Sequence, residues 1–439
     1  SSLPPSRYPV PPPSLSVSPH RDDVDPRVTS KPNRFLNDVD PTESWDSCPI
    51  HHVCSNQAQY FHAVSRGGYY KGAAKLVGRG LLSAAGDDFG VAMPVAWSIA
   101  GSEALGSRVG LGSSGFPPFL PREVEWIRDP AARRMARRIE RLPVQISFAK
   151  SAIMSSCVRP FRPGEAKLPV VLLHGFDSSC LEWSYSYPLL EEAGLETWAL
   201  DVLGWGFSEL GTLSRCHVDA KREHLYQLWR SYIRRPMILV GPSLGAAVAI
   251  DFAAHYPKAV SKLVLINASV YTEGTGILAK LPKFAAYAGV SLLKSMPLRF
   301  YANTLAFNNI SFSSNIDWTN VSTCTQLPFL CMEGHQCKQV TWAKVGRLHC
   351  LMPWWEDATV DFMASGGYNV SSHIKKINLK SIIIWGKEDR IVSHALASRL
   401  SNDMIDTHLH RIPGCGHLPH VEKPAVVVKS IVKFTYSNT

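Results

Sequence analysis

The stretch PMILVGPSLGAAVAIDFAA, residues 236–254, decides the fold of this chain. A short apolar run leads into the pattern Gly-x-Ser-x-Gly, formed by Gly241, Ser243 and Gly245, and a helical run of small apolar residues follows. The pattern alone often occurs by chance. Between a strand and a helix it predicts a nucleophile elbow, a sharp turn that exposes the serine hydroxyl at the end of a sheet. The start of the following helix favours negative charge that develops there. An ordinary strand-to-helix turn is the alternative interpretation.

Strand-like and helical runs alternate on both sides of this stretch. Strands are predicted at 144–148, 151–161, 168–175, 195–202, 236–241, 262–269, 381–386 and 407–414, and helices at 217–234, 243–256, 393–403 and 423–434. The strands are short, mostly apolar and rich in β-branched residues, as strands buried on both faces are. The alternation predicts an α/β fold with a mostly parallel sheet and helices on both faces.

A serine hydroxyl is a weak nucleophile unless a base takes its proton. His417 follows the last predicted strand in the motif PGCGH, and the two glycines of that motif give a loop that can carry an imidazole over Ser243. His420, three residues further along the chain, is the alternative base.

The base needs a carboxylate that orients it. The motif IIIWGKED is a predicted strand, a glycine turn and two acids, and it places Asp389 at the end of the strand. Glu388 precedes it, and either acid could instead be solvated. The end of the predicted strand KLVLINAS is the alternative position for this carboxylate, and it contains no acid. The order Ser243, Asp389, His417 along the chain is the one expected for this architecture.

Two main-chain amides are predicted to hold the oxyanion of the reaction. One is the N–H of Leu244, directly after the nucleophile, and the other is the N–H of Phe176 in the loop HGFD after the strand VVLL. His174 in the same loop is predicted to shape the turn rather than to take part in the chemistry.

Five motifs in order along the chain carry a resemblance to a known family. HGFDSS, DVLGWGFSE, GPSLGAA, WGKEDRIV and PGCGHLPHVEKP resemble those of the α/β-hydrolase superfamily over residues 144–437. The resemblance implies an eight-stranded sheet, a cap after strand six and the triad Ser243, Asp389 and His417. The chain is particularly similar to plant α/β-hydrolases directed to the chloroplast. Pro242 before the nucleophile departs slightly from the family pattern.

The nucleophile narrows the reaction. Epoxide hydrolases and haloalkane dehalogenases of this fold have an aspartate at the elbow, so Ser243 argues against both. Acyl transfer to water through an acyl-serine fits best, with an ester, a lipid or a thioester as substrate and no metal or organic cofactor. The alternatives are a C–C bond hydrolase or cofactor-free haloperoxidase with the same triad, a non-catalytic ligand-binding member of the fold, and a gene product that does not fold.

Several residues are candidates for contact with an apolar acyl or isoprenoid group, and the core is the alternative place for the aromatic ones. The substrate-binding candidates, beside Phe176, are Asp177, Trp183, Trp318, Trp354 and Trp355. The net charge of +10 comes without a long block of Lys or Arg, so nucleic acid is not an expected partner. The ten cysteines show no metal-binding spacing and are expected to be scattered thiols. Composition does not predict the oligomeric state.

The alternation of strands and helices is interrupted at residues 270–375, which are too long for one loop and predict an inserted helical lid. Within it, 277–307 is basic and amphipathic, and membrane contact is the alternative to a plain lid core with solvated lysines. Residues 321–344 match neither flank in composition and begin with Val-Ser-Thr, which a splice-donor-like sequence can encode. They are predicted to be a retained-intron insert.

The amino-terminal part is predicted to pack poorly. Residues 1–66 are rich in proline and serine and predict a disordered leader, either part of a chloroplast transit peptide or a plain flexible tail. Residues 67–143 predict a poorly ordered Gly/Ser-rich segment and then an Arg-rich helix at 122–141. The hydrolase core is expected at 144–269 and 376–439.

Overall fold

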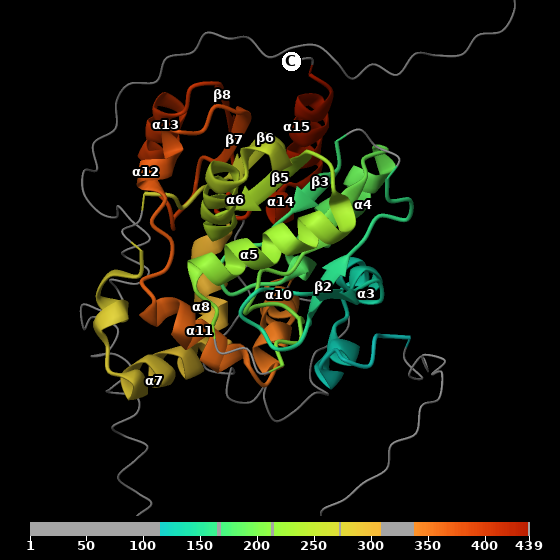
Figure 1. Ribbon diagram of the computed structural model, residues 1–439, viewed down its shortest axis with the longest axis vertical. Coiled ribbons are helices and arrows are strands. Elements are labelled where there is room, and N and C mark those ends of the chain that lie inside the picture. The colour runs from blue at the N-terminus through green and yellow to red at the C-terminus, as the bar shows by residue number, and fades with distance from the viewer. Residues whose placement is uncertain (1–114, 165–167, 212–214, 272–273, 309–337, 438–439) are drawn as a thin grey trace, which may run out of the picture. The chain divides into compact units, whose positions relative to one another are not determined.

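An eight-stranded sheet organises the part of the chain that the computed structural model describes, residues 115–164, 168–211, 215–271, 274–308 and 338–437 (Figure 1). Its strand order is β1-β2-β4-β3-β5-β6-β7-β8. The pairs β1–β2 and β2–β4 are antiparallel, and all other neighbours are parallel. The predicted α/β fold with a mostly parallel sheet is therefore confirmed.

The central strands are the ones that the sequence predicts best. The strands are β1 (Glu140–Val144), β2 (Ile153–Val158), β3 (Val170–Leu172), β4 (Thr197–Leu200), β5 (Met237–Pro242), β6 (Val260–Ile266), β7 (Lys380–Gly386) and β8 (Thr407–Ile412). Every residue of β3, β4 and β5 is buried, as continuous apolar runs predict.

The start of the sheet differs from the prediction. In place of one Arg-rich helix at 122–141, the chain forms η1 (Arg122–Trp126), α3 (Pro130–Ala136) and strand β1, so the predicted strand at 144–148 is wrong by four residues. Pro130 cannot continue a helix from the preceding residues, and the Asp129 side chain caps a new one by accepting from the Ala132 N–H at 2.7 Å. Residues 1–114 lie outside the described residues, and the predicted leader with them.

Helices cover both faces of the sheet. They are α4 (Ser186–Glu192), α5 (Val218–Leu228) with the π-helical turn η3 (Trp229–Ile233), α6 (Leu244–His255), α13 (His394–Asp403), α14 (Pro419–Glu422) and α15 (Pro424–Tyr436). Helix α4 packs on α15, and α5 packs on α6. In Figure 1, α5 and α6 lie in front of the strands. Among the described helices, none has both the length and the apolar character that crossing a bilayer requires.

A group of helices, here called the cap, lies between β6 and β7, where the sequence predicts an insertion at 270–375. The cap comprises η5 (Gly276–Lys280), α7 (Lys283–Leu293), α8 (Met296–Ala306), α10 (Lys338–Arg347), η8 (Leu348–Leu351), α11 (Trp355–Ala364) and α12 (Ser371–Ile374). Helix α10 packs on α8, and α11 packs on α7. Helices α7, α8, α10 and α11 thus lie together at one end of the sheet, whereas α12 lies beside α13 and packs on α6 (Figure 1).

The end of the predicted insert belongs to the cap. Residues 309–337 lie outside the described residues, but 338–344 form the first turns of α10. Trp342 is 8% exposed and stacks on Tyr185, with ring centroids 5.8 Å apart, and Ala343 is buried. Residues 338–344 therefore do not fit the prediction of a foreign segment, and deleting 321–344 would remove part of the folded core.

Candidate active site

Ser243 occupies the turn between β5 and α6 in a strained conformation, with φ 50° and ψ −119°. Its N–H donates to the Ile266 carbonyl at 2.8 Å, and its own carbonyl accepts from the N–H groups of Ala246 and Ser269, both at 3.1 Å. A positive φ is costly for a residue with a side chain and persists only where the surroundings enforce it. The neighbouring strand and helix thus hold the turn that the sequence predicts.

The two glycines of the motif are required by close backbone approach. A Cβ on Gly241 would lie 2.2 Å from the carbonyl oxygen of Gly245. A Cβ on Gly245 would lie 2.6 Å from the carbonyl oxygen of His174. Because both obstacles are backbone atoms, no side-chain movement can relieve either clash. The elbow therefore packs directly against the loop that follows β3.

Asp389 and His417 meet across the loops after β7 and β8. His417 Nδ1 lies 2.8 Å from Asp389 Oδ2, and the Asn267 side-chain amide donates to the same oxygen at 2.6 Å. The other oxygen accepts from the N–H groups of Ile391 at 2.7 Å and Val392 at 3.0 Å. An ionised carboxylate accepts only, so His417 carries its proton on Nδ1 and leaves Nε2 as the acceptor.

This arrangement keeps Asp389 ionised. Burial alone would raise the pKa of Asp389, but the His417 imidazole and the hydrogen bonds from His417, Asn267 and Val392 together hold that pKa below its usual value. The Asp389 side chain is fully buried and that of His417 is 6% exposed. Water therefore screens the pair little, and the carboxylate can both orient the imidazole and stabilise positive charge on it.

The loop that carries His417 is fastened to the end of cap helix α8. The His417 N–H donates to the Ala306 carbonyl at 2.7 Å. A Cβ on Gly416 would lie 2.4 Å from the same carbonyl oxygen, and the Gly416 N–H donates to Glu422 at 2.8 Å. Gly416, one of the two glycines expected to give a flexible loop, thus serves close packing instead, while Gly414 has a positive φ of 62°.

A cavity of about 190 Å³ brings the candidate residues together. Ser243, His417, Phe176 and Leu244 all line it, and so does Asp177. Most of the remaining lining is apolar and comes from the cap and from the loops after β7 and β8: Leu293, Leu298, Ala302, Ala306, Trp342, Ala343, Val345, Ile391 and Leu418. The cavity therefore offers an apolar chamber against the exposed end of the nucleophile elbow.

Comparisons with known proteins agree with this fold. The model of the family described as "Alpha/beta hydrolase family" matches residues 170–430. This chain belongs to that family. It is 54% identical to the alpha/beta hydrolase domain-containing protein VTE7 of Arabidopsis thaliana over 329 residues, 74% of this chain and 92% of the relative.

More distant relatives share the fold. The monoacylglycerol lipase ABHD6 of Homo sapiens is 24% identical over 63% of this chain and 77% of the relative. The solved structure of a thermophilic esterase from Thermogutta terrifontis, 18% identical, superimposes with a TM-score of 0.51 over 67% of this chain and 98% of the esterase. The chain is thus a hydrolase of the α/β fold.

Of the predicted substrate contacts that lie in the described part of this hydrolase, Asp177 alone lines the cavity. Trp183 is fully buried and its indole N–H donates to the Leu173 carbonyl at 2.7 Å. Trp355 is 1% exposed and donates to Asp177 at 2.9 Å. These two and Trp354 do not line the cavity, so the cavity gives their prediction as substrate contacts no support. Trp318 lies outside the described residues.

Trp342 is the aromatic lining residue that the sequence prediction missed. It lies within residues 321–344, which the sequence predicts to be an insert. No motif in the sequence of α10 marks this tryptophan as facing a pocket. Only its spacing from Val345 and Gly346, which also line the cavity, marks one face of the helix.

His420, the alternative base, has a different partner. It is fully buried, and its Nε2 lies 2.8 Å from Glu182 Oε1. The other oxygen of Glu182 accepts from the Gly175 N–H at 3.2 Å. Burial would raise the pKa of Glu182, but the hydrogen bond to His420 and the charges of His420 and His174 hold it below the usual value. The His420–Glu182 pair therefore supports the loop after β3, and the His420 imidazole does not line the cavity.

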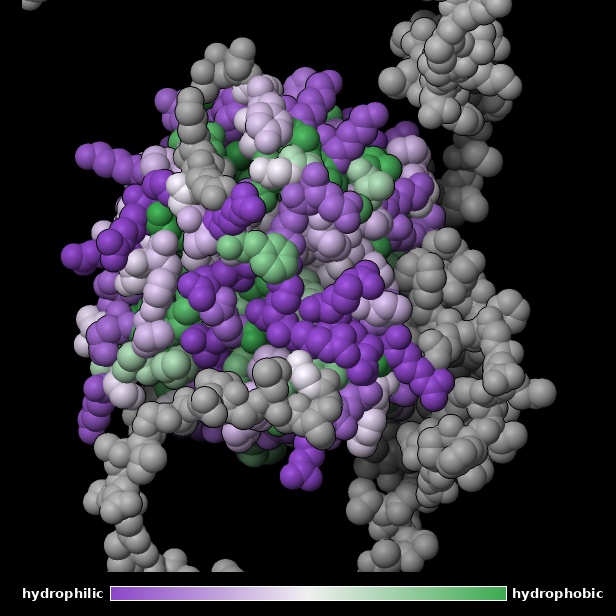
Figure 2. Space-filling model, turned by 90° about the vertical axis from the view of Figure 1, so that its right-hand side faces the viewer, coloured by the Kyte–Doolittle hydropathy of each residue, from purple (hydrophilic) through white to green (hydrophobic). Residues whose placement is uncertain are grey.

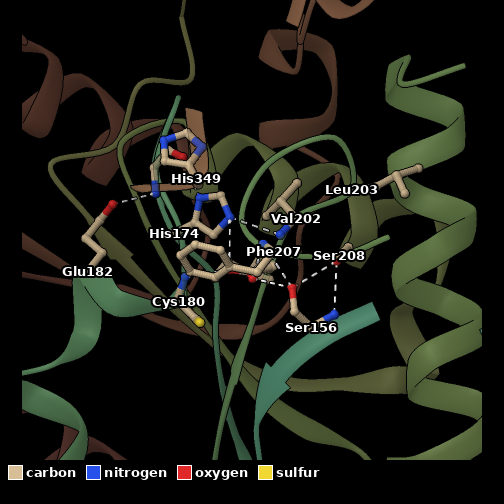
Figure 3. A network of polar contacts seen from close by, with 12 residues as sticks. Ser156, His174, Cys180, Glu182, Val202, Leu203, Phe207, Ser208 and His349 are labelled. Carbon is tan, nitrogen blue, oxygen red and sulfur yellow. Dashed lines mark hydrogen bonds and ion pairs between the residues drawn. The ribbon is translucent and has the colours of Figure 1, made fainter. Parts of the chain in front are cut away.

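His174 shapes this loop, as predicted. Its Nε2 accepts from the Val202 N–H at 3.0 Å while Nδ1 lies 2.8 Å from the Gly175 carbonyl, so Nδ1 carries the proton (Figure 3). Nearby, buried Asp201 accepts from the N–H groups of Cys180 at 2.6 Å and Phe207 at 2.9 Å. These bonds tie the loops after β3 and β4 to each other beneath the site.

Two groups of described residues contain metal-ligating types, Asp177 with His349 and Cys350, and Asp251 with His255 and His373. In each group an arginine already pairs with the carboxylate, Arg299 with Asp177 and Arg222 with Asp251. The guanidinium places positive charge where a cation would bind, so we assign no metal to either group.

Proposed function

We propose that this chain is a serine hydrolase that cleaves a carboxylic ester of an apolar acyl group, including lipid esters and thioesters, through an acyl-serine intermediate. The observation that carries the proposal is the buried Asp389–His417 pair, joined at 2.8 Å, whose imidazole lines the same cavity as Ser243. Base, orienting carboxylate and nucleophile come from the ends of three different strands, the arrangement this chemistry needs.

The reaction divides into two acyl transfers. His417 Nε2 takes the proton of Ser243 Oγ as the oxygen attacks the ester carbonyl, and the N–H groups of Leu244 and Phe176 donate to the oxyanion that forms. The imidazolium then gives its proton to the leaving alcohol or thiol as the acyl-serine forms. Water attacks the acyl-serine with His417 again as base, which releases the acid and restores Ser243.

The apolar lining of the cavity supports an apolar acyl group as the substrate. The name of the distant relative from Homo sapiens, monoacylglycerol lipase, agrees with an ester of this kind. A relative from Burkholderia vietnamiensis, 25% identical over 62% of this chain and 88% of its own length, is named as a 2-hydroxy-6-oxononadienedioate hydrolase. Hydrolysis of a C–C bond with the same three residues is therefore the second candidate function.

A fluorophosphonate probe tests the proposal. The wild-type protein is expected to become labelled on Ser243, and Ser243→Ala is expected to remain unlabelled while keeping its melting temperature. Hydrolysis of p-nitrophenyl esters without turnover of a 2-hydroxy-6-oxo-dienoate favours the ester over the C–C bond. Labelling that persists in Ser243→Ala would contradict the assignment, and an unlabelled wild type that binds apolar ligands tightly would indicate a receptor.

We further propose that α7 contacts a membrane surface. Leu281, Phe284 and Leu292 are 37%, 79% and 51% exposed on or beside this helix, next to exposed Lys280 and Lys283. Exposed apolar side chains with flanking lysines suit an anionic lipid interface. By contrast, the side viewed in Figure 2, which includes α3 and α4, is mostly hydrophilic with scattered apolar residues.

Phe284→Asp is expected to lower binding to phosphatidylglycerol vesicles about tenfold, because it removes a large apolar group from the interface and adds a repelled charge. Co-sedimentation measures the bound fraction. Phe161→Asp is the matched control, since Phe161 is also 79% exposed but lies outside the cap. Equal loss in both variants, or no binding by the wild type, would contradict membrane contact through α7.

The localisation stays a prediction. The relative from Arabidopsis thaliana shows kinship with a plant protein, which supports a plant origin. We propose the chloroplast as the compartment, because the composition of residues 1–66 is typical of part of a transit peptide.

A further inference from the structure

Asp177, directly after the predicted oxyanion donor Phe176, is bound by three parts of the cap. Arg299 of α8 donates to Oδ2 at 2.7 Å, and the Trp355 indole N–H at the start of α11 donates to Oδ1 at 2.9 Å. His349 Nε2 lies 2.9 Å from the main-chain carbonyl of Asp177, so it donates to that oxygen. Both the side chain and the backbone of this one loop residue are therefore held from the cap.

The contacts with Asp177 are made away from water. Its side chain is 11% exposed and that of Arg299 is 12% exposed. Both carboxylate oxygens accept from donors, and these contacts and the charge of Arg299 offset part of the burial that raises the pKa of Asp177 above its usual value. Leaving a buried carboxylate without its partner is costly, so a movement of Arg299 is expected to move the loop that carries Asp177 with it.

The hydrolase core holds the other end of the same loop. The Gly175 N–H donates to Glu182 at 3.2 Å, and a Cβ on Gly175 would lie only 3.7 Å from the Ser243 Cβ. The Phe176 ring packs edge-on against Trp205, with centroids 5.2 Å apart. The Phe176 peptide N–H thus lies between a segment fixed by the core and a residue fixed by the cap.

Asp177 also has an unusual backbone conformation, with φ 51°. Aspartate enters the left-handed region more readily than most residues, but the conformation still needs support from its surroundings. The contacts from Arg299, Trp355 and His349 supply that support. If the cap moved away, Asp177 would be free to relax, and the two peptide groups before it, including the Gly175–Phe176 peptide that carries the Phe176 N–H, would be free to turn with it.

We propose that Asp177 and Arg299 form a positioning pair through which the cap sets the direction of the Phe176 N–H. The oxyanion site is then complete only while the cap is seated on the loop. Neither residue donates to the reacting atoms; both act through the Phe176 peptide. This inference rests on the proposed serine hydrolase function.

The pair also links substrate fit to catalysis. Arg299 lines the cavity together with Leu298, Ala302 and Asn303 of α8. An acyl group that fits beside α8 leaves the Arg299–Asp177 contact in place. A group that displaces α8 pulls Arg299 away and weakens the oxyanion site, so poor substrates should suffer mainly in kcat.

Asp177→Asn tests the pair while retaining a residue that tolerates positive φ. We expect kcat for a p-nitrophenyl ester to fall about 10- to 100-fold with KM changed less than about threefold, because oxyanion contacts act mainly in the transition state. Arg299→Lys, which keeps the charge, should retain more of the rate than Arg299→Met. Glu356→Gln is the control, because it breaks the Lys294–Glu356 pair within the cap without touching the loop, and it should keep the wild-type kcat.

Hydrogen exchange supplies a readout that needs no activity. Amides of residues 174–178 should exchange about tenfold faster in Asp177→Asn than in the wild type, and at the wild-type rate in Glu356→Gln. If the wild type hydrolyses no ester, the proposed function fails but the exchange rates still decide whether the cap positions the loop. Unchanged exchange in Asp177→Asn, or a kcat that falls as far in Glu356→Gln, would overturn the positioning pair.

Discussion

Replacing His417 with alanine is expected to lower kcat/KM for a short p-nitrophenyl ester by about 10⁴-fold or more while the fold stays intact. Without the imidazole, Ser243 loses the base that Asp389 orients. The remaining rate comes from binding and from the two main-chain donors. Steady-state kinetics on the variant, with circular dichroism to verify folding, measures the effect.

The double variant Ser243→Ala/His417→Ala sharpens this prediction. Because nucleophile and base act as one unit, the double variant should be no slower than either single variant. His420→Gln is the matched comparison, since His420 pairs with Glu182 rather than with Asp389. A His417→Ala protein that keeps more than about a tenth of the wild-type rate would refute His417 as the base.

The elbow and the strand segments along the chain could be predicted from the sequence because both depend on local patterns. The residues of β5 and the motif at Gly241, Ser243 and Gly245 determine a strand, a tight turn and a helix without distant contacts. The meeting of Asp389 and His417 follows from topology as well, since β7 and β8 are parallel neighbours whose carboxyl ends lie at one edge. The hydrophobic periodicity and the order of the motifs were therefore sufficient to predict the fold class and the candidate triad.

The walls of the cavity could not be predicted in this way. Which aromatic residues face the cavity depends on how the cap packs on the sheet. The indole N–H groups of Trp183 and Trp355 donate to protein acceptors instead, the Leu173 carbonyl and Asp177. The pairing of Glu182 with His420 joins residues 238 positions apart in sequence, which no local pattern reveals. The Arg-rich helix failed for a local reason, because the break at Pro130 outweighed a weak apolar stripe.

Asp389→Asn is expected to lower kcat about 10⁴-fold although it preserves the shape of the side chain. The backbone N–H groups of Ile391 and Val392 point at one oxygen position, so the asparagine oxygen is expected there and its NH₂ group faces His417. His417 Nδ1 must then accept, which moves the ring proton to Nε2 and leaves no acceptor for the Ser243 hydroxyl. Pre-steady-state release of p-nitrophenol measures the loss of acylation.

The second His–carboxylate pair provides the matched variant, Glu182→Gln. Asp389 and Glu182 both have pKa values held below their usual range in the fold. Each therefore contributes stability that is present above the ordinary carboxyl pKa of about 4 and is lost as the pH falls through the lower folded value. Both variants should thus lose less stability than the wild type on acidification below about pH 4.

The two variants are expected to differ in activity, although they respond alike to acid. Glu182→Gln can still hold the Gly175 N–H through its carbonyl oxygen, so its kcat should stay within about tenfold of the wild type, whereas Asp389→Asn loses orders of magnitude. Equal losses of kcat in the two variants would mean that the pairs act together on one loop. A larger loss in Glu182→Gln would move the orienting role to the His420 pair, because a buried carboxylate orients the base only when its own hydrogen bond fixes the tautomer that the serine needs.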